Sequence, residues 1–198
     1  MPGSTAFIET THDLRHFDTS VDDAGFKRSS RGFEILLGNT LDLSGVTYVE
    51  LGVGFIRQTF GSQPTGIPNI GPTQGFAFKG NLVWNPTDLI TISGNLRREV
   101  NETTTPGAAS AFTSSFELKA DYGLLEELLL SAGGRFDIET FDGIGRTDKL
   151  LKFDLGGKYY LGSYFIADAK YTYEERFADD PGGSYVINTL LLSLTARF

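Results

Sequence analysis

The sequence predicts an all-β protein, a transmembrane antiparallel up-and-down β-barrel of about ten strands. Three observations support this prediction. Apolar and polar residues alternate with a period of two in about ten segments, the connections alternate between short and long, and aromatic residues gather at the segment ends. No uncharged apolar run approaches the roughly 20 residues of a membrane helix. A membrane-embedded form of this chain must therefore be a closed sheet, which satisfies the backbone groups in lipid.

The alternation is clearest in the segment 185–198. Val186, Leu192 and Leu194 fall on one face, which carries no charge, while threonine, serine and arginine side chains fall on the other. A strand in a soluble sandwich shows the same alternation. However, about ten residues with an uncharged apolar face also suit a strand that crosses a membrane. Phe198, which follows alternating apolar residues, is similar to the signal by which bacterial outer-membrane barrels are recognised for insertion.

The rest of the chain repeats this pattern. In the third segment, for example, Leu51, Val53 and Phe55 alternate with Gly52 and Gly54. We expect strands at about 6–17, 31–41, 46–60, 75–85, 89–100, 112–122, 128–140, 147–160, 164–177 and 185–198. Ten strands form one barrel domain over residues 1–198, and an even number leaves both termini on the same side.

The connections between these strands differ in length in a regular way. Short turns rich in Asp, Asn, Pro and Gly alternate with longer loops, and such turns are typical of hairpins. The short ones are 42–45, 86–88, 123–127 and 161–163, and the longer ones are 18–30, 61–74, 101–110, 142–146 and 178–184. Outer-membrane barrels have tight periplasmic turns and longer extracellular loops. The pattern thus predicts a bacterial outer-membrane location with periplasmic termini.

Aromatic residues at the strand ends predict two girdles, one at each membrane interface. We expect the girdles to contain Phe17, Phe60, Phe112 and Phe177 beside the long loops, and Trp84, Tyr122, Tyr159 and Phe198 beside the short turns or the terminus. In a soluble sandwich, large aromatic residues would instead tend towards the strand centres.

The composition excludes several kinds of function. The chain has 25 acidic and 17 basic residues and no cysteine. A net charge of -8 disfavours nucleic acid as a partner, and the absence of cysteine removes disulfides and thiolate metal sites. His12 and His16 lie four residues apart on one strand, about 13 Å by the strand rise, which is too far for one metal ion. The sequence predicts no enzyme and no catalytic, cofactor-binding or metal-binding residues.

The second face of the strands carries charge of both signs, and we expect it to line the lumen. The predicted lumen-lining residues are Glu50, Lys79, Arg97, Glu99, Glu117, Lys119, Asp121, Arg135, Asp137, Lys152, Asp154, Lys158, Asp168, Lys170 and Arg197. Ten strands leave at most a narrow passage, because eight are filled by their own side chains and 16 leave a channel. Two interpretations stay open, a small-solute pore with a slight preference for cations and a polar plug. As half of a larger barrel, the same face would line a wide lumen.

Three stretches and the closing strand carry a family resemblance. The stretches are GFIRQTF at 54–60, LVWNPT at 82–87 and LRREVNETT at 96–104. They resemble the putative β-barrel porin family 2, whose members are outer-membrane barrels of Gram-negative bacteria often associated with exopolysaccharide production and export. Family members are usually longer, and this chain resembles their carboxy-terminal half, so the domain is expected to be whole or the carboxy-terminal part of a larger barrel. The resemblance transfers no catalytic residue.

Residue pattern and resemblance together predict a porin-like passage for polar solute or polysaccharide through a charged lumen. The alternative is a closed structural or adhesive barrel that acts through its extracellular loops. The partners implied are outer-membrane lipid, polysaccharide or small polar solutes, and periplasmic export partners.

Overall fold

The fold is seen in a computed structural model that describes residues 3–18, 21, 27–66, 71–103, 105, 107–108 and 110–197. It contains ten strands: β1 (Gly3–Arg15), β2 (Ser30–Asp42), β3 (Thr47–Phe60), β4 (Thr73–Thr87), β5 (Ile90–Asn101), β6 (Ala111–Leu125), β7 (Leu128–Phe141), β8 (Thr147–Leu161), β9 (Phe165–Phe177) and β10 (Tyr185–Ala196). The predicted all-β fold and strand number are confirmed, and the strand ends differ from expectation by at most three residues.

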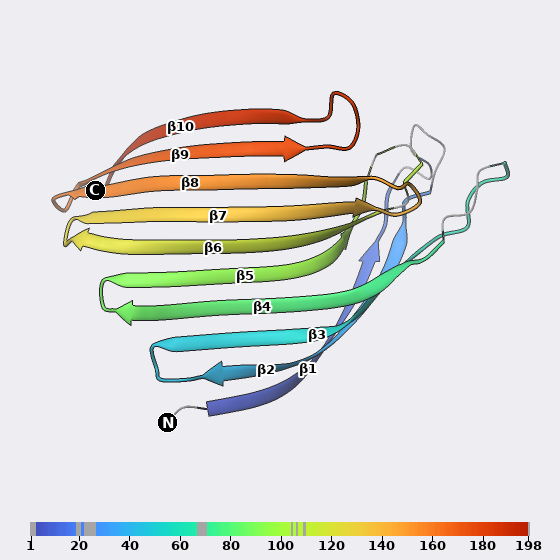
Figure 1. Cartoon of the computed structure of the whole chain (residues 1–198), viewed down its shortest axis with the longest axis horizontal. Helices are drawn as coiled ribbons and strands as arrows, with labels where there is room; N and C mark the ends of the chain where they lie inside the picture. Colours follow the sequence, from blue (N-terminus) through green and yellow to red (C-terminus); the bar gives the residue numbers. More distant parts are fainter. Residues whose placement is uncertain are drawn as a thin grey trace.

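The strands form one up-and-down sheet in which every neighbour in sequence is an antiparallel neighbour in space. Short turns and both termini lie at one end of the strands, and the longer loops lie at the other (Figure 1). We call these the turn end and the loop end. The part of the chain that the structure describes contains no helix long and apolar enough to cross a membrane.

Turn chemistry explains the tight connection between β2 and β3. Gly45 has a φ of 72°, a conformation that costs a residue with a Cβ atom more than it costs glycine. The Asp42 Oδ1 atom accepts a hydrogen bond from the Gly45 N–H at 2.9 Å, which closes the turn. These two residues therefore fix the register of Leu41 opposite Val49.

The sheet divides at the loop end between β4 and β5. These strands pair only from Lys79 opposite Arg97 towards the turn end. Beyond that point β4 continues beside β3 as far as Thr73, and β5 continues beside β6 as far as Asn101. In Figure 1 the loop ends of β1 and β2 turn away from the direction of β6 to β9. The two parts of the sheet are then free to pack on one another.

A small apolar core fills the division. Leu36, Ile56 and Ala77 from β2, β3 and β4 pack against Val100 of β5, and the partly buried Phe112 of β6 joins them. Leu36 is 1% exposed. Alternation along β5 and β6 puts Val100 and Phe112 in phase with the exposed Phe116 and Leu118, so the outer side of β5 and β6 contacts the inner side of β2 to β4. This packing holds β1 to β4 tightly curled at the loop end.

The two edge strands pair on one side each in the described residues, β1 with β2 and β10 with β9. All twelve residues of β10 are exposed, including Ile187 and Leu191 on one face and Leu190 and Leu192 on the other. No residue of β10 is charged. The described residues show no pairing between β1 and β10, so the ten strands form a curved sheet with two free edges and do not close on themselves.

The charged face of the sheet as candidate functional site

The ten strands have two chemically different faces. Strand pairing places Glu50, Lys79, Arg97, Glu99, Glu117, Lys119, Asp121, Arg135, Asp137, Lys152, Asp154, Lys158, Asp168 and Lys170 on the same side of the sheet. We call this side the charged face and the other the apolar face. Fourteen of the fifteen residues expected to line a lumen therefore share one surface. Arg197 follows β10, and its backbone N–H donates to the Tyr164 carbonyl oxygen at 2.8 Å.

A depression of about 460 Å³ lies in the charged face across β6 to β9, and we call it the basin. Its lining includes the glycines Gly133 and Gly156 and the small residue Ser131. Its charged lining residues are five cations (Lys119, Arg135, Lys152, Lys158 and Lys170) and four carboxylates (Glu117, Asp121, Asp154 and Asp168). The glycines leave a low floor between taller charged side chains.

Ion pairs in the basin differ in how tightly they are made. Lys119 Nζ lies 2.8 Å from Asp121, and Lys170 Nζ lies 3.0 Å from Asp154. By contrast, Lys158 Nζ is 3.9 Å from Asp168, which exceeds the length of a hydrogen bond. Lys152 Nζ is likewise 3.6 Å from Glu174. Lys152 and Lys158 thus keep N–H donors that these carboxylates do not take up.

The charged face over β1 to β5 is organised differently. Lys79 Nζ lies 3.0 Å from Glu9 and 3.0 Å from Glu50, so one ammonium joins β1, β3 and β4. Near the turn end, the ring of Phe7 lies over Gly38 and Gly52, where an added Cβ atom would meet it. From the turn end to the middle of the strands, this half of the face is covered by its own side chains.

Arg15 fastens β1 across the charged face at the loop end. Its Nη2 atom donates to the Val100 carbonyl oxygen at 3.1 Å, and its Nη1 atom lies 3.6 Å from Glu102. Burial of the Glu102 side chain raises the pKa of its carboxyl, and the nearby Arg15 charge opposes this shift. Glu102 belongs to the loop that follows β5.

A second charged cluster closes the loop end of β7 to β9. The Asp148 side chain is 2% exposed and lies 2.7 Å from both Arg146 and Arg176. Arg176 also pairs with Glu139 at 2.9 Å. The hydrogen bonds to Asp148 raise the pKa of Arg146, which lies in the loop before β8. Sequence reasoning missed Arg146, Asp148 and Arg176 as a cluster, although Asp148 and Arg176 have the phase of the charged face.

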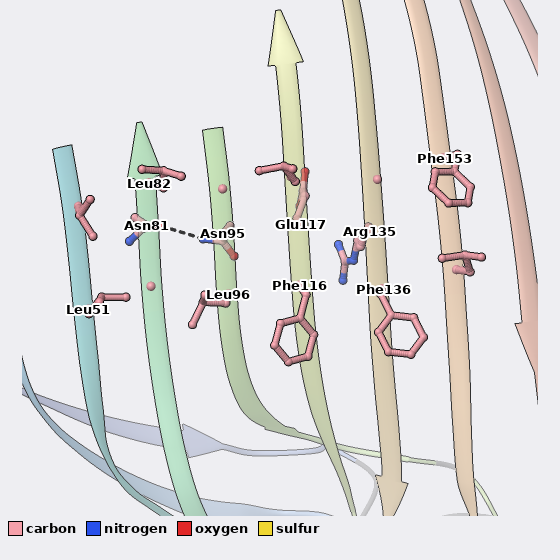
Figure 2. A pocket seen from close by; sticks show the side chains of 16 residues that line it. Leu51, Asn81, Leu82, Asn95, Leu96, Phe116, Glu117, Arg135, Phe136 and Phe153 are labelled. Carbon is pink, nitrogen blue, oxygen red and sulfur yellow. Dashed lines mark hydrogen bonds between the residues drawn. The ribbon is translucent and has the colours of Figure 1, made fainter. Parts of the chain in front are cut away.

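The apolar face has its own shallow hollow, which spans β3 to β8 and has a volume of about 630 Å³ (Figure 2). Its walls include Leu51, Leu96, Phe116 and Phe153, and Gly80 is among its lining residues. Asn95 Nδ2 donates a hydrogen bond to Asn81 Oδ1 across the strands at 2.8 Å (Figure 2), and both side chains have the phase of the charged face. Exposed leucine and phenylalanine therefore dominate this surface.

Four of the expected girdle residues lie on the apolar face and are exposed: Trp84, Tyr122, Tyr159 and Phe177. Phe17 is also exposed, in the loop after β1. Phe60 and Phe112 differ from expectation. Phe60 lies in the phase of the charged face and is 8% exposed, and Phe112 packs on the small apolar core, with Arg98 above its ring at 4.5 Å. Phe198 lies outside the described residues.

Comparisons with known proteins agree with this architecture. The family model described as Putative beta-barrel porin 2 matches residues 1–198. The FrpB iron transporter from Neisseria meningitidis (F3-3 variant) is similar in structure, with a TM-score of 0.65 and 10% identity over 100% of this chain and 38% of that one. OmpTdeltaL8, an outer-membrane protein of Vibrio cholerae with loop L8 deleted, has a TM-score of 0.54 and 14% identity over 98% of this chain and 62% of that one.

No curated protein has a sequence significantly similar to this chain. The chain spans less than two thirds of the length of both similar structures, FrpB and OmpTdeltaL8. At such low identities the similarity concerns the fold, an antiparallel sheet of the outer-membrane β-barrel type.

Proposed function

Since this chain belongs to the family described as Putative beta-barrel porin 2, we propose that it forms a porin-like, non-enzymatic passage for polar solute across the bacterial outer membrane. The solute is a small polar molecule or polysaccharide, and it moves along the charged face. Lipid covers the apolar face.

One observation carries this proposal, namely the contrast between the two faces of the same strands. On β8, for example, Phe153 and Leu155 are 49% and 60% exposed on one side, while Lys152 and Asp154 lie on the other. Leucine and phenylalanine at such exposure are unfavourable in water and favourable in lipid. Ionised side chains on the opposite face need water or each other. A sheet that separates lipid from an aqueous passage meets both requirements. Because lipid leaves no sheet edge unpaired, the passage requires further strands that pair with β1 and β10.

The orientation follows from the connections. The short turns lie at the same end as both termini (Figure 1). In outer-membrane barrels the short turns face the periplasm. The proposal therefore places both termini in the periplasm and Arg146 and Glu102 in the extracellular loops.

A second candidate function is a closed barrel that acts through its loops. It is favoured by the half of the charged face over β1 to β5, where Phe7, Lys79 and Arg15 cover the surface. The open basin over β6 to β9 favours a passage instead. Periplasmic export partners fit either function.

Single-channel conductance in planar bilayers tests the proposal. Glu117→Trp places a large ring on the charged face, so we expect smaller conductance steps than in the unmodified protein. Phe116→Trp is the matched control, because Phe116 is the neighbouring residue on the apolar face and is 42% exposed. Silent membranes with the unmodified protein would favour the closed barrel. Equal effects of the two substitutions would contradict a passage along the charged face.

A further inference from the structure

The charge of the basin differs from that of the whole chain. The chain carries 25 acidic and 17 basic residues, whereas the lining of the basin contains five cations and four carboxylates. A second depression over β1, β2, β3 and β5 has the opposite balance, with Asp13, Glu34 and Glu99 against Arg15 and Arg97. Basic side chains are thus concentrated in one place on an acidic protein.

Strand register brings two of these cations directly together. Arg135 of β7 lies opposite Lys152 of β8. Like charges at directly opposed positions are destabilising in a sheet. Asp137, at 2.9 Å from Arg135, and Glu174, at 3.6 Å from Lys152, lie to either side of this pair. Asp137 and Glu174 offset part of the repulsion between Arg135 and Lys152, and an anion bound above this pair would offset the rest.

Donors for such an anion are available. Lys152 and Lys158 lie 3.6 Å and 3.9 Å from their carboxylate partners, and each ammonium has three N–H groups. The side chains of Lys158 and Lys170 are 43% and 48% exposed. They can reorient towards a ligand without losing a buried contact.

The floor of the basin gives a ligand room. Gly133 and Gly156 belong to the charged-face phase and carry no side chain into the depression. A volume of about 460 Å³ lies within the range of small-molecule sites, which runs from about 300 to 1,000 Å³. A six-carbon acid fits such a space.

From these four features we propose that the basin is a binding site for small organic anions, with Lys152, Lys158, Lys170 and Arg135 as the residues that bind the anionic group. The inference rests on the proposed passage, since it names the class of solute that pauses on the charged face. Hydroxyl groups of the ligand lie over the glycine floor, where Asp154 and Ser131 accept or donate hydrogen bonds.

Equilibrium binding to the purified protein in non-ionic detergent tests the site. Gluconate is the probe, and sorbitol is the neutral control, because the two differ by a carboxylate in place of a hydroxymethyl group. We expect saturable gluconate binding that weakens with added salt, and no sorbitol binding. The double variant K152Q/K158Q should bind gluconate at least about tenfold more weakly, because it removes two of the four cations that bind the anionic group.

Two further variants separate the site from general effects. Lys149→Gln removes an exposed lysine of β8 that lies in the apolar-face phase, so gluconate affinity should not change. Gly133→Val fills the floor without changing charge, and an added Cβ atom there meets its neighbours at 3.7 Å or more, so the sheet should tolerate it. We expect Gly133→Val to weaken binding as well, which also covers the case in which the double variant does not fold.

The results separate the two proposals. Absence of gluconate binding, equal binding of sorbitol, or an equal loss in Lys149→Gln would overturn the anion site. Conductance in bilayers without gluconate binding would leave the passage intact and refute only the site. Gluconate binding in detergent without any conductance would support the site and refute the passage.

Discussion

The two halves of the sheet share the same alternation of apolar and polar residues, but their inward faces differ. In β1 to β5 the inward side chains include Phe7, Leu36 and Ile56, and a small apolar core closes the loop end. In β6 to β9 the inward side chains are mostly charged and surround the open basin. The difference shows that alternation decides which residues share a face, whereas the size and charge of the inward residues decide whether that face is filled or open.

The largest expected effect comes from the core of the first half. Leu36→Ala removes a side chain that is 1% exposed, and we expect a loss of about 3 kcal/mol in the free energy of unfolding. Leu37→Ala, one residue along and 62% exposed on the apolar face, should cost less than about 0.5 kcal/mol in detergent. Reversible urea unfolding in detergent measures both. Equal losses would show that the first half has no filled interior.

The second half contains a tightly packed carboxylate at the loop end, Asp148. Asp148→Asn breaks the pairs with Arg146 and Arg176 in a position that is 2% exposed, and we expect a cost of about 2–4 kcal/mol. Asp168→Asn is the control, because that carboxylate is 32% exposed and its lysine lies 3.9 Å away. The same urea experiment compares the two. A small cost at Asp148 would mean that the cluster does not hold the strands together.

Lysines of the two halves should differ in stability in a smaller but measurable way. Lys79→Gln leaves Glu9 and Glu50 without their shared cation, and we expect a loss of about 1–2 kcal/mol. Lys158→Gln in the basin should change stability by less than about 0.5 kcal/mol. Thermal unfolding followed by circular dichroism at one pH and salt concentration suffices for this comparison. A reversed order would contradict a structural role for the first set of charges and a binding role for the second.

The smallest effect concerns pH at the contact between β1 and the loop after β5. Burial raises the pKa of Glu102 in the folded protein, so protonation of Glu102 favours the folded contact. The stabilising effect is complete below the unfolded pKa of 4.5 and is lost as the pH rises through the higher folded pKa. Hydrogen exchange of residues 100–103, corrected for intrinsic rates, should become faster over that interval. Glu102→Gln should remove this dependence, and its persistence in the variant would assign it to another group.

Most of the fold follows from the sequence alone. Period-two alternation located all ten strands, because each strand has one apolar face that contrasts with a polar one. It also put fourteen charged residues on one side, since a face is fixed once the register is continuous. Neither inference needs knowledge of how the strands curve.

The division of the sheet could not be read from that pattern. Val100 and Phe112 have the same phase as Phe116 and Leu118, yet the first two pack in the small apolar core and the last two are exposed. Which of these side chains are covered depends on where β4 and β5 separate, and the alternation does not reveal that position. Leu36 and Ile56 did carry a signal. They are apolar residues in the phase of the charged face, and this indicates that they pack in an interior. The basin was missed because its floor is made by glycines, which have no side chain and so leave no trace in an alternation of apolar and polar residues.

The free edge of β10 has a consequence for the life of this chain before it reaches a membrane. Twelve consecutive uncharged residues with open backbone groups offer a template on which a second copy, or any extended peptide, can anneal. In water this edge therefore favours aggregation between copies of the chain. The most apolar edge of the sheet is thus also the segment most prone to aggregation before the chain inserts into a membrane.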